Sequence, residues 1–102
     1  MKLRKTDKRF NLYRYGFDCY IEFKHDDWQG YNKYLQYCRK TFGDEYWRFM
    51  EREYTPNGRW KGVYRHRTKR GVETKRIYFR GEKYHTMLLM AIPLEDKNTF
   101  YL

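Results

Sequence analysis

The sequence predicts an α+β fold in which one amphipathic helix packs on a largely antiparallel sheet of four or five strands. Three patterns support this: apolar alternation before residue 25, helical apolar spacing over residues 28–42, and short strand-like segments separated by turn residues thereafter. The expected order is β-α-β-β-β-β, within one α+β domain at residues 9–94. Residues 1–8 are expected to form a frayed basic N-terminal arm, and residues 95–102 a C-terminal tail that could dock on the core.

The first expected strand covers residues 13–24, where apolar and polar side chains alternate with a period of two. Gly16 interrupts this long run and is expected to mark a bulge or a bend. Tyr20 falls on the polar side of the alternation, between Asp18 and Glu22. The side expected to face the core contains Tyr13, Tyr15, Phe17, Cys19, Ile21 and Phe23.

The helix is expected over residues 28–42. Asp26 or Asp27 would cap its first turn by accepting free backbone N–H groups, and Gly43 is a natural residue to end it. Spacings of three and four place the apolar side chains on a single helical face, formed by Trp28, Tyr31, Leu35, Cys38 and Phe42.

Four further strands are expected at residues 45–54, 59–68, 72–80 and 83–92. Tight turns join them: residues 55–58 suit a type I turn, residues 69–71 a second turn, and residues 81–82 a two-residue hairpin turn. Pro93 would end the last strand. The strands before and after the helix could be parallel neighbours through a right-handed crossover.

The formal net charge of +10 is concentrated in two segments. Residues 59–80, here called the basic ribbon, contain nine Lys and Arg against one Glu; residues 1–14 contain six against one Asp. The rest of the chain holds eight basic and eleven acidic residues. Because a merely solvated surface usually mixes both signs, this distribution favours binding to a polyanion, either DNA or RNA or the acidic surface of a protein.

A regular strand in the basic ribbon would place Arg59, Lys61, Arg65 and Arg67 in a row about 7 Å apart, which suits the phosphates of a nucleic acid. Aromatic side chains beside the row could stack on bases, whereas Trp28, Tyr31, Trp47 and Phe49 are expected to pack in the core. The candidate binding residues are Arg59, Trp60, Lys61, Tyr64, Arg65, Arg67, Lys69, Arg70, Lys75, Arg76, Tyr78 and Arg80 in the ribbon, and Lys5, Lys8 and Arg9 in the arm.

Recognition of the phosphate backbone with little sequence specificity is expected, since the sequence has no RRM signature, KH-type GXXG loop or zinc-finger spacing. No cofactor or metal site is expected. Cys19 and Cys38 lack metal-ligand spacing and are expected to be reduced and buried. No secretory signal or membrane span is recognised, which favours a cytoplasmic protein without a membrane partner, in the host cell if the source is viral.

Two alternatives remain open. A compact, basic, aromatic-rich chain would suit a virus- or phage-type accessory protein that inhibits or regulates a larger protein machine. A small basic endoribonuclease is the second alternative, by analogy only. Its general acid, general base and phosphate-binding cation would come from Glu51 or Glu53, His66 or His85, and Arg65 with Arg67.

Overall fold

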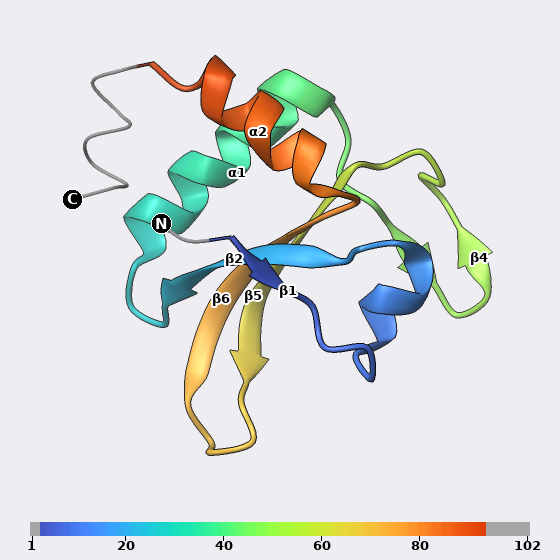
Figure 1. Cartoon of the computed structure of the whole chain (residues 1–102), viewed down its shortest axis with the longest axis vertical. Coiled ribbons are helices and arrows are strands. Elements are labelled where there is room, and N and C mark those ends of the chain that lie inside the picture. Colours follow the sequence, from blue (N-terminus) through green and yellow to red (C-terminus); the bar gives the residue numbers. More distant parts are fainter. Residues whose placement is uncertain (1–2, 94–102) are drawn as a thin grey trace.

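The computed structural model describes residues 3–93 and is built around a four-stranded antiparallel sheet in the order β1-β2-β6-β5 (Figure 1). This arrangement confirms the predicted α+β class. Every pairing in the sheet is antiparallel, so the parallel crossover considered from the sequence is wrong. The strands are β1 (Arg4–Lys5), β2 (Cys19–Lys24), β5 (Trp60–Arg67) and β6 (Glu73–Phe79).

Two helices, rather than the single expected one, cover the same face of the sheet: α1 (Trp28–Phe42) and α2 (Glu82–Ala91). The α1 boundaries match the prediction. The Asp27 side chain accepts the Gly30 N–H at 3.0 Å, and Gly43 ends the helix with a φ of 83°. The core between helices and sheet is largely aromatic and contains Phe23, Tyr31, Tyr34, Trp60 and Phe79, with Ile21, Ile77, Cys38 and Leu88.

The predicted strand at residues 83–92 is wrong, because this segment forms α2. His85, Leu88 and Ile92 recur at helical spacing and are the buried residues of the segment. Gly81 precedes the helix with a φ of 117° instead of forming a hairpin turn. Ile92 adopts extended backbone before Pro93, as a residue preceding proline is expected to do, and so ends the helix.

The strand expected at residues 13–24 begins only at Cys19. A 3-10 helix spans Asn11–Tyr15 and ends at Gly16, whose φ of 93° reverses the chain direction before the buried Phe17. Alternation in the first half of the segment therefore reflects packing of a tight helical turn, not a strand. The basic arm also differs from expectation, because Arg4 and Lys5 pair with Tyr20 and Cys19 at the sheet edge.

Residues 45–54 form a small hairpin instead of one strand. β3 (Arg48–Phe49) pairs with β4 (Arg52–Glu53), and Met50 adopts a left-handed φ of 55° at the turn between them. The exposed fractions of Trp47 and Phe49 are 50% and 57%, and that of Trp28 on α1 is 50%, so the predicted core role of these three residues is wrong. The turn at residues 55–58 is as predicted, with a 2.9 Å hydrogen bond from the Gly58 N–H to the Thr55 carbonyl.

The described part of the chain, residues 3–93, contains no helix long and apolar enough to cross a membrane. The predicted C-terminal tail at residues 95–102 lies outside the described residues.

Candidate functional site

A bulge in β5 decides which face each basic-ribbon side chain occupies. Val63 pairs with Arg76 and His66 with Thr74, so Tyr64 and Arg65 together lie opposite Lys75. This extra residue reverses the alternation beyond it. The expected row from Arg59 to Arg67 on one face is therefore wrong, and the ring of His66 lies on the sheet face away from the helices, against Phe10 at 5.6 Å between centroids.

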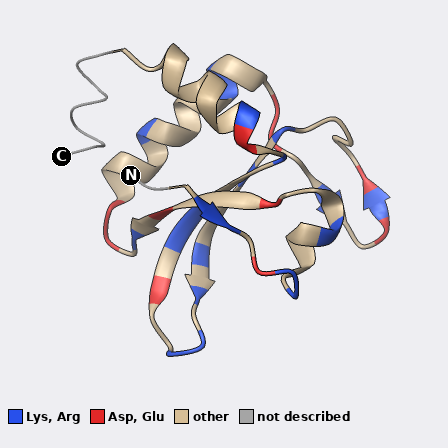
Figure 2. Ribbon diagram, viewed as in Figure 1, with Lys and Arg blue, Asp and Glu red and all other residues tan. Residues whose placement is uncertain are grey.

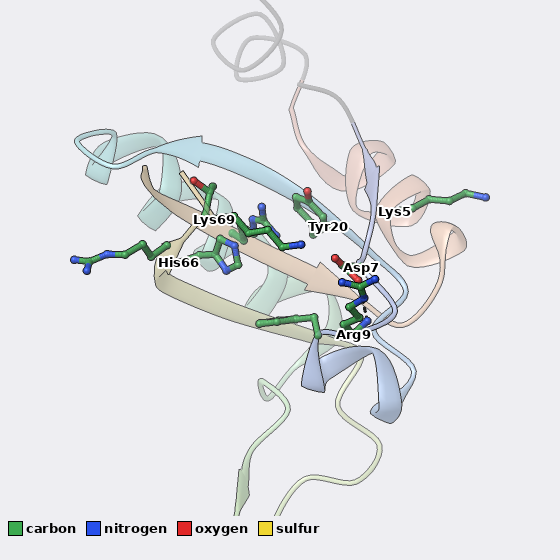
Figure 3. A pocket seen from close by; sticks show the side chains of 10 residues that line it. Lys5, Asp7, Arg9, Tyr20, His66 and Lys69 are labelled. Carbon is green, nitrogen blue, oxygen red and sulfur yellow. Dashed lines mark hydrogen bonds between the residues drawn. The ribbon is translucent and has the colours of Figure 1, made fainter. Parts of the chain in front are cut away.

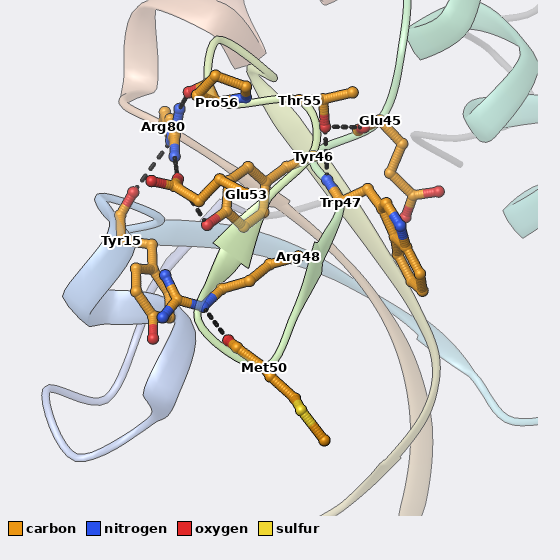
Figure 4. A network of polar contacts seen from close by, with 10 residues as sticks. All are labelled: Tyr15, Glu45, Tyr46, Trp47, Arg48, Met50, Glu53, Thr55, Pro56 and Arg80. Carbon is orange, nitrogen blue, oxygen red and sulfur yellow. Dashed lines mark hydrogen bonds and ion pairs between the residues drawn. The ribbon is translucent and has the colours of Figure 1, made fainter.

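Most cations near the base of the ribbon are engaged within the protein. Lys61 Nζ lies 3.3 Å from Glu45, and Arg76 Nε donates to Glu22 at 2.8 Å. The Arg80 guanidinium donates to the carbonyls of Tyr15, at 3.0 Å, and Pro56, and it lies 3.8 Å from Glu53 (Figure 4). These residues hold segments of the protein together, which weakens their case as phosphate ligands.

Three further candidates are similarly occupied. Lys75 is only 4% exposed; its ammonium donates to the His25 carbonyl and lies 3.9 Å from the Trp28 ring centroid. Arg65 forms an ion pair with Glu73. Arg59 lies over the ring of Tyr84 at 5.6 Å. Burial removes Lys75 from any binding surface, whereas Arg59 and Arg65 remain exposed.

The three aromatic candidates of the basic ribbon differ sharply in how exposed their rings are. Trp60 and Tyr78 are each 0% exposed, so neither ring can stack on a base at the surface. The Trp60 indole N–H donates to the Gly43 carbonyl at 3.1 Å, which ties it into the core. Tyr64, at the bulge, is 64% exposed and is the one stacking candidate of the three that remains available.

A concave surface of about 610 Å³ lies between the N-terminal segment and the outer end of the basic ribbon; we call it the basic recess. Figure 2 shows Lys and Arg positions on both of these segments, while Asp and Glu are scattered over several elements. The recess is lined by Lys5, Asp7, Arg9, Phe10, Tyr20, His66, Arg67, Thr68, Lys69 and Arg76.

Opposite sides of the basic recess carry cations that are free of internal partners. Figure 3 shows His66 and Lys69 on the ribbon side and Arg9 with Asp7 on the other, while the Lys5 side chain extends away from them. Within residues 3–93, the side chains of Arg9, Arg67 and Lys69 form no ion pair or hydrogen bond. Asp7 is the single acidic residue of the lining, and its carboxylate accepts the Arg9 backbone N–H at 2.8 Å.

A planar, fixed surface lies between these two sides. The Arg76 guanidinium sits 4.0 Å from the centroid of the Tyr20 ring. Its Nε is held by Glu22, and its Nη1 donates to the Tyr78 hydroxyl at 3.2 Å. Because three groups fix the guanidinium, little conformational entropy would be lost if a ligand packed against it.

His66 completes this part of the basic recess. Burial lowers the pKa of its imidazole below the usual value, and the nearby positive charge of Arg76 lowers it further. The ring is therefore neutral near pH 7, with one nitrogen that donates and one that accepts a hydrogen bond. The sequence did place His66 among candidate residues, but only for catalysis.

The remaining candidates of the arm and the ribbon, Lys8 and Arg70, lie outside the lining of the basic recess. Arg70 is exposed at the turn of the β5–β6 hairpin, where Gly71 has a φ of 80° and donates its N–H to Thr68 at 2.9 Å. Lys8 is exposed and lines a separate cavity of about 440 Å³ with Lys5, Asp18 and Glu82. Two acidic groups in that cavity make it a poorer anion site.

The trio suggested for a ribonuclease is not assembled. Glu53 is held by the Tyr46 hydroxyl at 2.9 Å and by Arg80. His85 is buried in α2, with its ring 5.4 Å from that of Phe79, while His66 lies at the basic recess. Glu51 is exposed on the β3–β4 turn. Within residues 3–93, no hydrogen bond or ion pair joins Glu51 or Glu53 to either imidazole.

The described residues contain no group of three or more His, Cys, Asp or Glu side chains placed to hold a metal ion. Cys19 and Cys38 are both buried and free. Burial raises the pKa of the Cys19 thiol to about 12, so it is protonated and a weak nucleophile at neutral pH.

Comparison with known proteins finds no matching family model, no matching curated protein and no matching solved structure. The site must therefore be interpreted from its own chemistry. Sequence reasoning missed Phe10 and Tyr20 as recess residues. For Tyr20 there was a signal, because the alternation placed this aromatic ring on the polar face between Asp18 and Glu22.

Proposed function

We propose that the protein is a small, non-enzymatic nucleic-acid-binding protein that contacts the phosphate backbone with little sequence specificity. The observation that supports this most strongly is the basic recess, where two segments more than 50 residues apart place Arg9 opposite Lys69, with Arg67 also in the lining. Cations without internal partners can exchange their counterions for phosphates without breaking contacts that hold the fold together. The binding surface is thus smaller than the whole basic ribbon.

The number of available cations sets the expected salt dependence. With three phosphate contacts, from Arg9, Arg67 and Lys69, log K should fall against log salt with a slope of about −2 for a single strand and about −3 for a duplex. The cations at the base of the ribbon contribute less, because Lys61 and Arg76 already have carboxylate partners.

The test compares two triple variants with equal changes in net charge. Arg9→Gln, Arg67→Gln and Lys69→Gln together should weaken oligonucleotide binding at least about tenfold at 100 mM salt and flatten the salt slope by about 2. The control is Lys40→Gln, Arg52→Gln and Lys83→Gln, three exposed positions outside the basic recess. Fluorescence anisotropy with labelled oligonucleotides measures both quantities, and thermal melting checks that both variants fold.

Equal loss in the two triple variants would show that net charge alone drives binding and would contradict the recess as the site. Failure of the wild-type protein to bind any single-stranded or duplex DNA or RNA at 50 mM salt would contradict the function itself. If the wild-type protein binds no nucleic acid but retains a stoichiometric protein partner after nuclease treatment, the acidic-protein alternative is favoured.

A further inference from the structure

The shape and the interior of the basic recess indicate which form of nucleic acid fits it. A recess of about 610 Å³ falls within the range of about 300–1,000 Å³ typical of small-molecule sites. That volume admits a nucleotide unit, whereas a duplex presents its bases stacked and paired within a much wider body. A duplex could touch the rim, but its base faces could not enter.

The interior of the basic recess offers flat surfaces for an unpaired base. The Arg76 guanidinium lies over the buried ring of Tyr20, which supports it from beneath, and the partly buried ring of His66 lies nearby in the same lining. Unpaired bases stack on aromatic rings and on guanidinium planes in proteins that bind single strands. The cations stand at the sides instead, where phosphates on either side of an inserted base would lie.

We propose that the basic recess binds single-stranded nucleic acid, with one unpaired base packed against Arg76 and His66 and the flanking phosphates beside Arg9 and Lys69. This proposal rests on the proposed function, because it names the ligand of the same site. Single-stranded DNA and RNA share the required chemistry, since each presents an unpaired base face and flanking phosphates.

The first experiment leaves the protein unchanged and varies the ligand. A labelled ten-nucleotide strand is compared with the same strand annealed to its complement and with a strand of the same length in which the bases are replaced by abasic sites. DNA and RNA versions are run in parallel. We expect the single strand to bind about tenfold more tightly than the duplex and the abasic strand, because both lack an accessible base.

The second experiment combines a protein variant with the ligand change. His66→Ala should weaken binding of the intact single strand about fivefold and leave binding of the abasic strand unchanged, because the ring would contact only the base. Phe49→Ala is the matched control, since Phe49 is an exposed ring on β3 that does not line the recess. It should change neither affinity by more than about twofold.

The outcomes distinguish failure of the single-strand assignment from failure of the proposed nucleic-acid-binding function. Duplex binding as tight as single-strand binding, or an abasic strand that binds as well as the intact one, would overturn the single-strand assignment and leave the nucleic-acid function standing. Loss of intact and abasic binding alike in His66→Ala would overturn the base contact. Absence of binding to every ligand would overturn the proposed function.

Discussion

The base and the tip of the basic ribbon contain the same types of residue but differ in what surrounds them. At the base, Arg76 and Arg80 reach Glu22 and Glu53, carboxylates supplied by β2 and β4. Near the tip, Arg67 and Lys69 have no such partner within residues 3–93. The difference shows that carboxylates neutralise the base more fully than the tip, where Glu73 forms an ion pair with Arg65 and lies across from Arg67, but Arg67 and Lys69 form no ion pair.

This contrast also explains why the excess charge is compatible with a folded domain. Paired or ring-stacked cations at the base contribute to stability, whereas a surplus at the tip costs only weak, screened repulsion. Substitution of Arg80 should therefore change the free energy of unfolding, and substitutions at the tip should change binding. Substitution of Arg76, which also lines the basic recess, should change both.

The largest expected effect follows from Arg80. Arg80→Gln removes two hydrogen bonds to backbone carbonyls, the contact with Glu53, and the packing of the guanidinium 4.6 Å from the Tyr46 ring centroid. The free energy of unfolding should fall by about 2–3 kcal/mol. Urea denaturation followed by tryptophan fluorescence measures this change.

Arg70→Gln is the matched control for Arg80→Gln, because it makes the same substitution at the exposed turn of the same hairpin. Its free energy of unfolding should stay within about 0.5 kcal/mol of wild type. Similar losses in the two variants would contradict the division between base and tip.

A smaller effect is expected from the buried Lys75. Lys75→Met keeps the aliphatic stem but removes the ammonium from the His25 carbonyl and the Trp28 ring, so the free energy of unfolding should fall by about 1–2 kcal/mol. Oligonucleotide affinity should stay within about twofold of wild type.

Lys69→Gln should show the reverse pattern: unchanged stability and roughly threefold weaker binding. Measurement of both properties in both variants tests the comparison directly, and a binding loss in Lys75→Met as large as that in Lys69→Gln would refute it.

The smallest expected effect is a change with pH. Burial lowers the pKa of both His66 and His85 in the folded protein. The unfolded chain therefore takes up protons first as the pH falls, so the free energy of unfolding is fully retained above about pH 6.5 and declines below it. Urea midpoints at pH 7.5 and 5.5 measure the decline.

Nucleic-acid affinity should move in the opposite direction over the same range. His66 faces Arg76 and Glu22 on the sheet and shares the basic recess with Asp7, Arg9 and Lys69. A protonated ring adds positive charge there, so affinity should rise about two- to fivefold between pH 7.5 and 5.5. The rise should persist in His85→Gln and disappear in His66→Gln; its persistence in the latter would assign it to another group.

Local patterns predicted the helix at 28–42 and the two long strands of the hairpin, because capping residues, helical spacing and turn glycines each act over a few residues. The sequence patterns missed α2, where an apolar run fits either a helix or a strand and tertiary packing decides. They also missed the β3–β4 turn, since Met50 is not a residue that signals a left-handed conformation.

The candidate site was predicted only in outline. Charge counting identified the two segments that meet at the basic recess, but it could not identify which cations would find carboxylate partners. Trp60 and Tyr78 were assigned to the surface because strand alternation does not show that the helices cover one face, over Trp60, and that Phe10, Phe17 and Tyr46 cover the other, over Tyr78. The bulge at Tyr64 and Arg65 carries no turn residue, so the reversal that brings His66 to the recess was unpredictable from the pattern.

The same bulge has a consequence for how molecules of this protein meet one another. β5 is an outer strand of eight residues, long enough to offer its unpaired backbone groups to the edge of a second molecule and so to seed aggregation. An irregular register halfway along, between Val63 and His66, interrupts that template, and the like charges of Arg65 and Arg67 oppose close approach. One inserted residue thus shapes the basic recess and protects an exposed sheet edge.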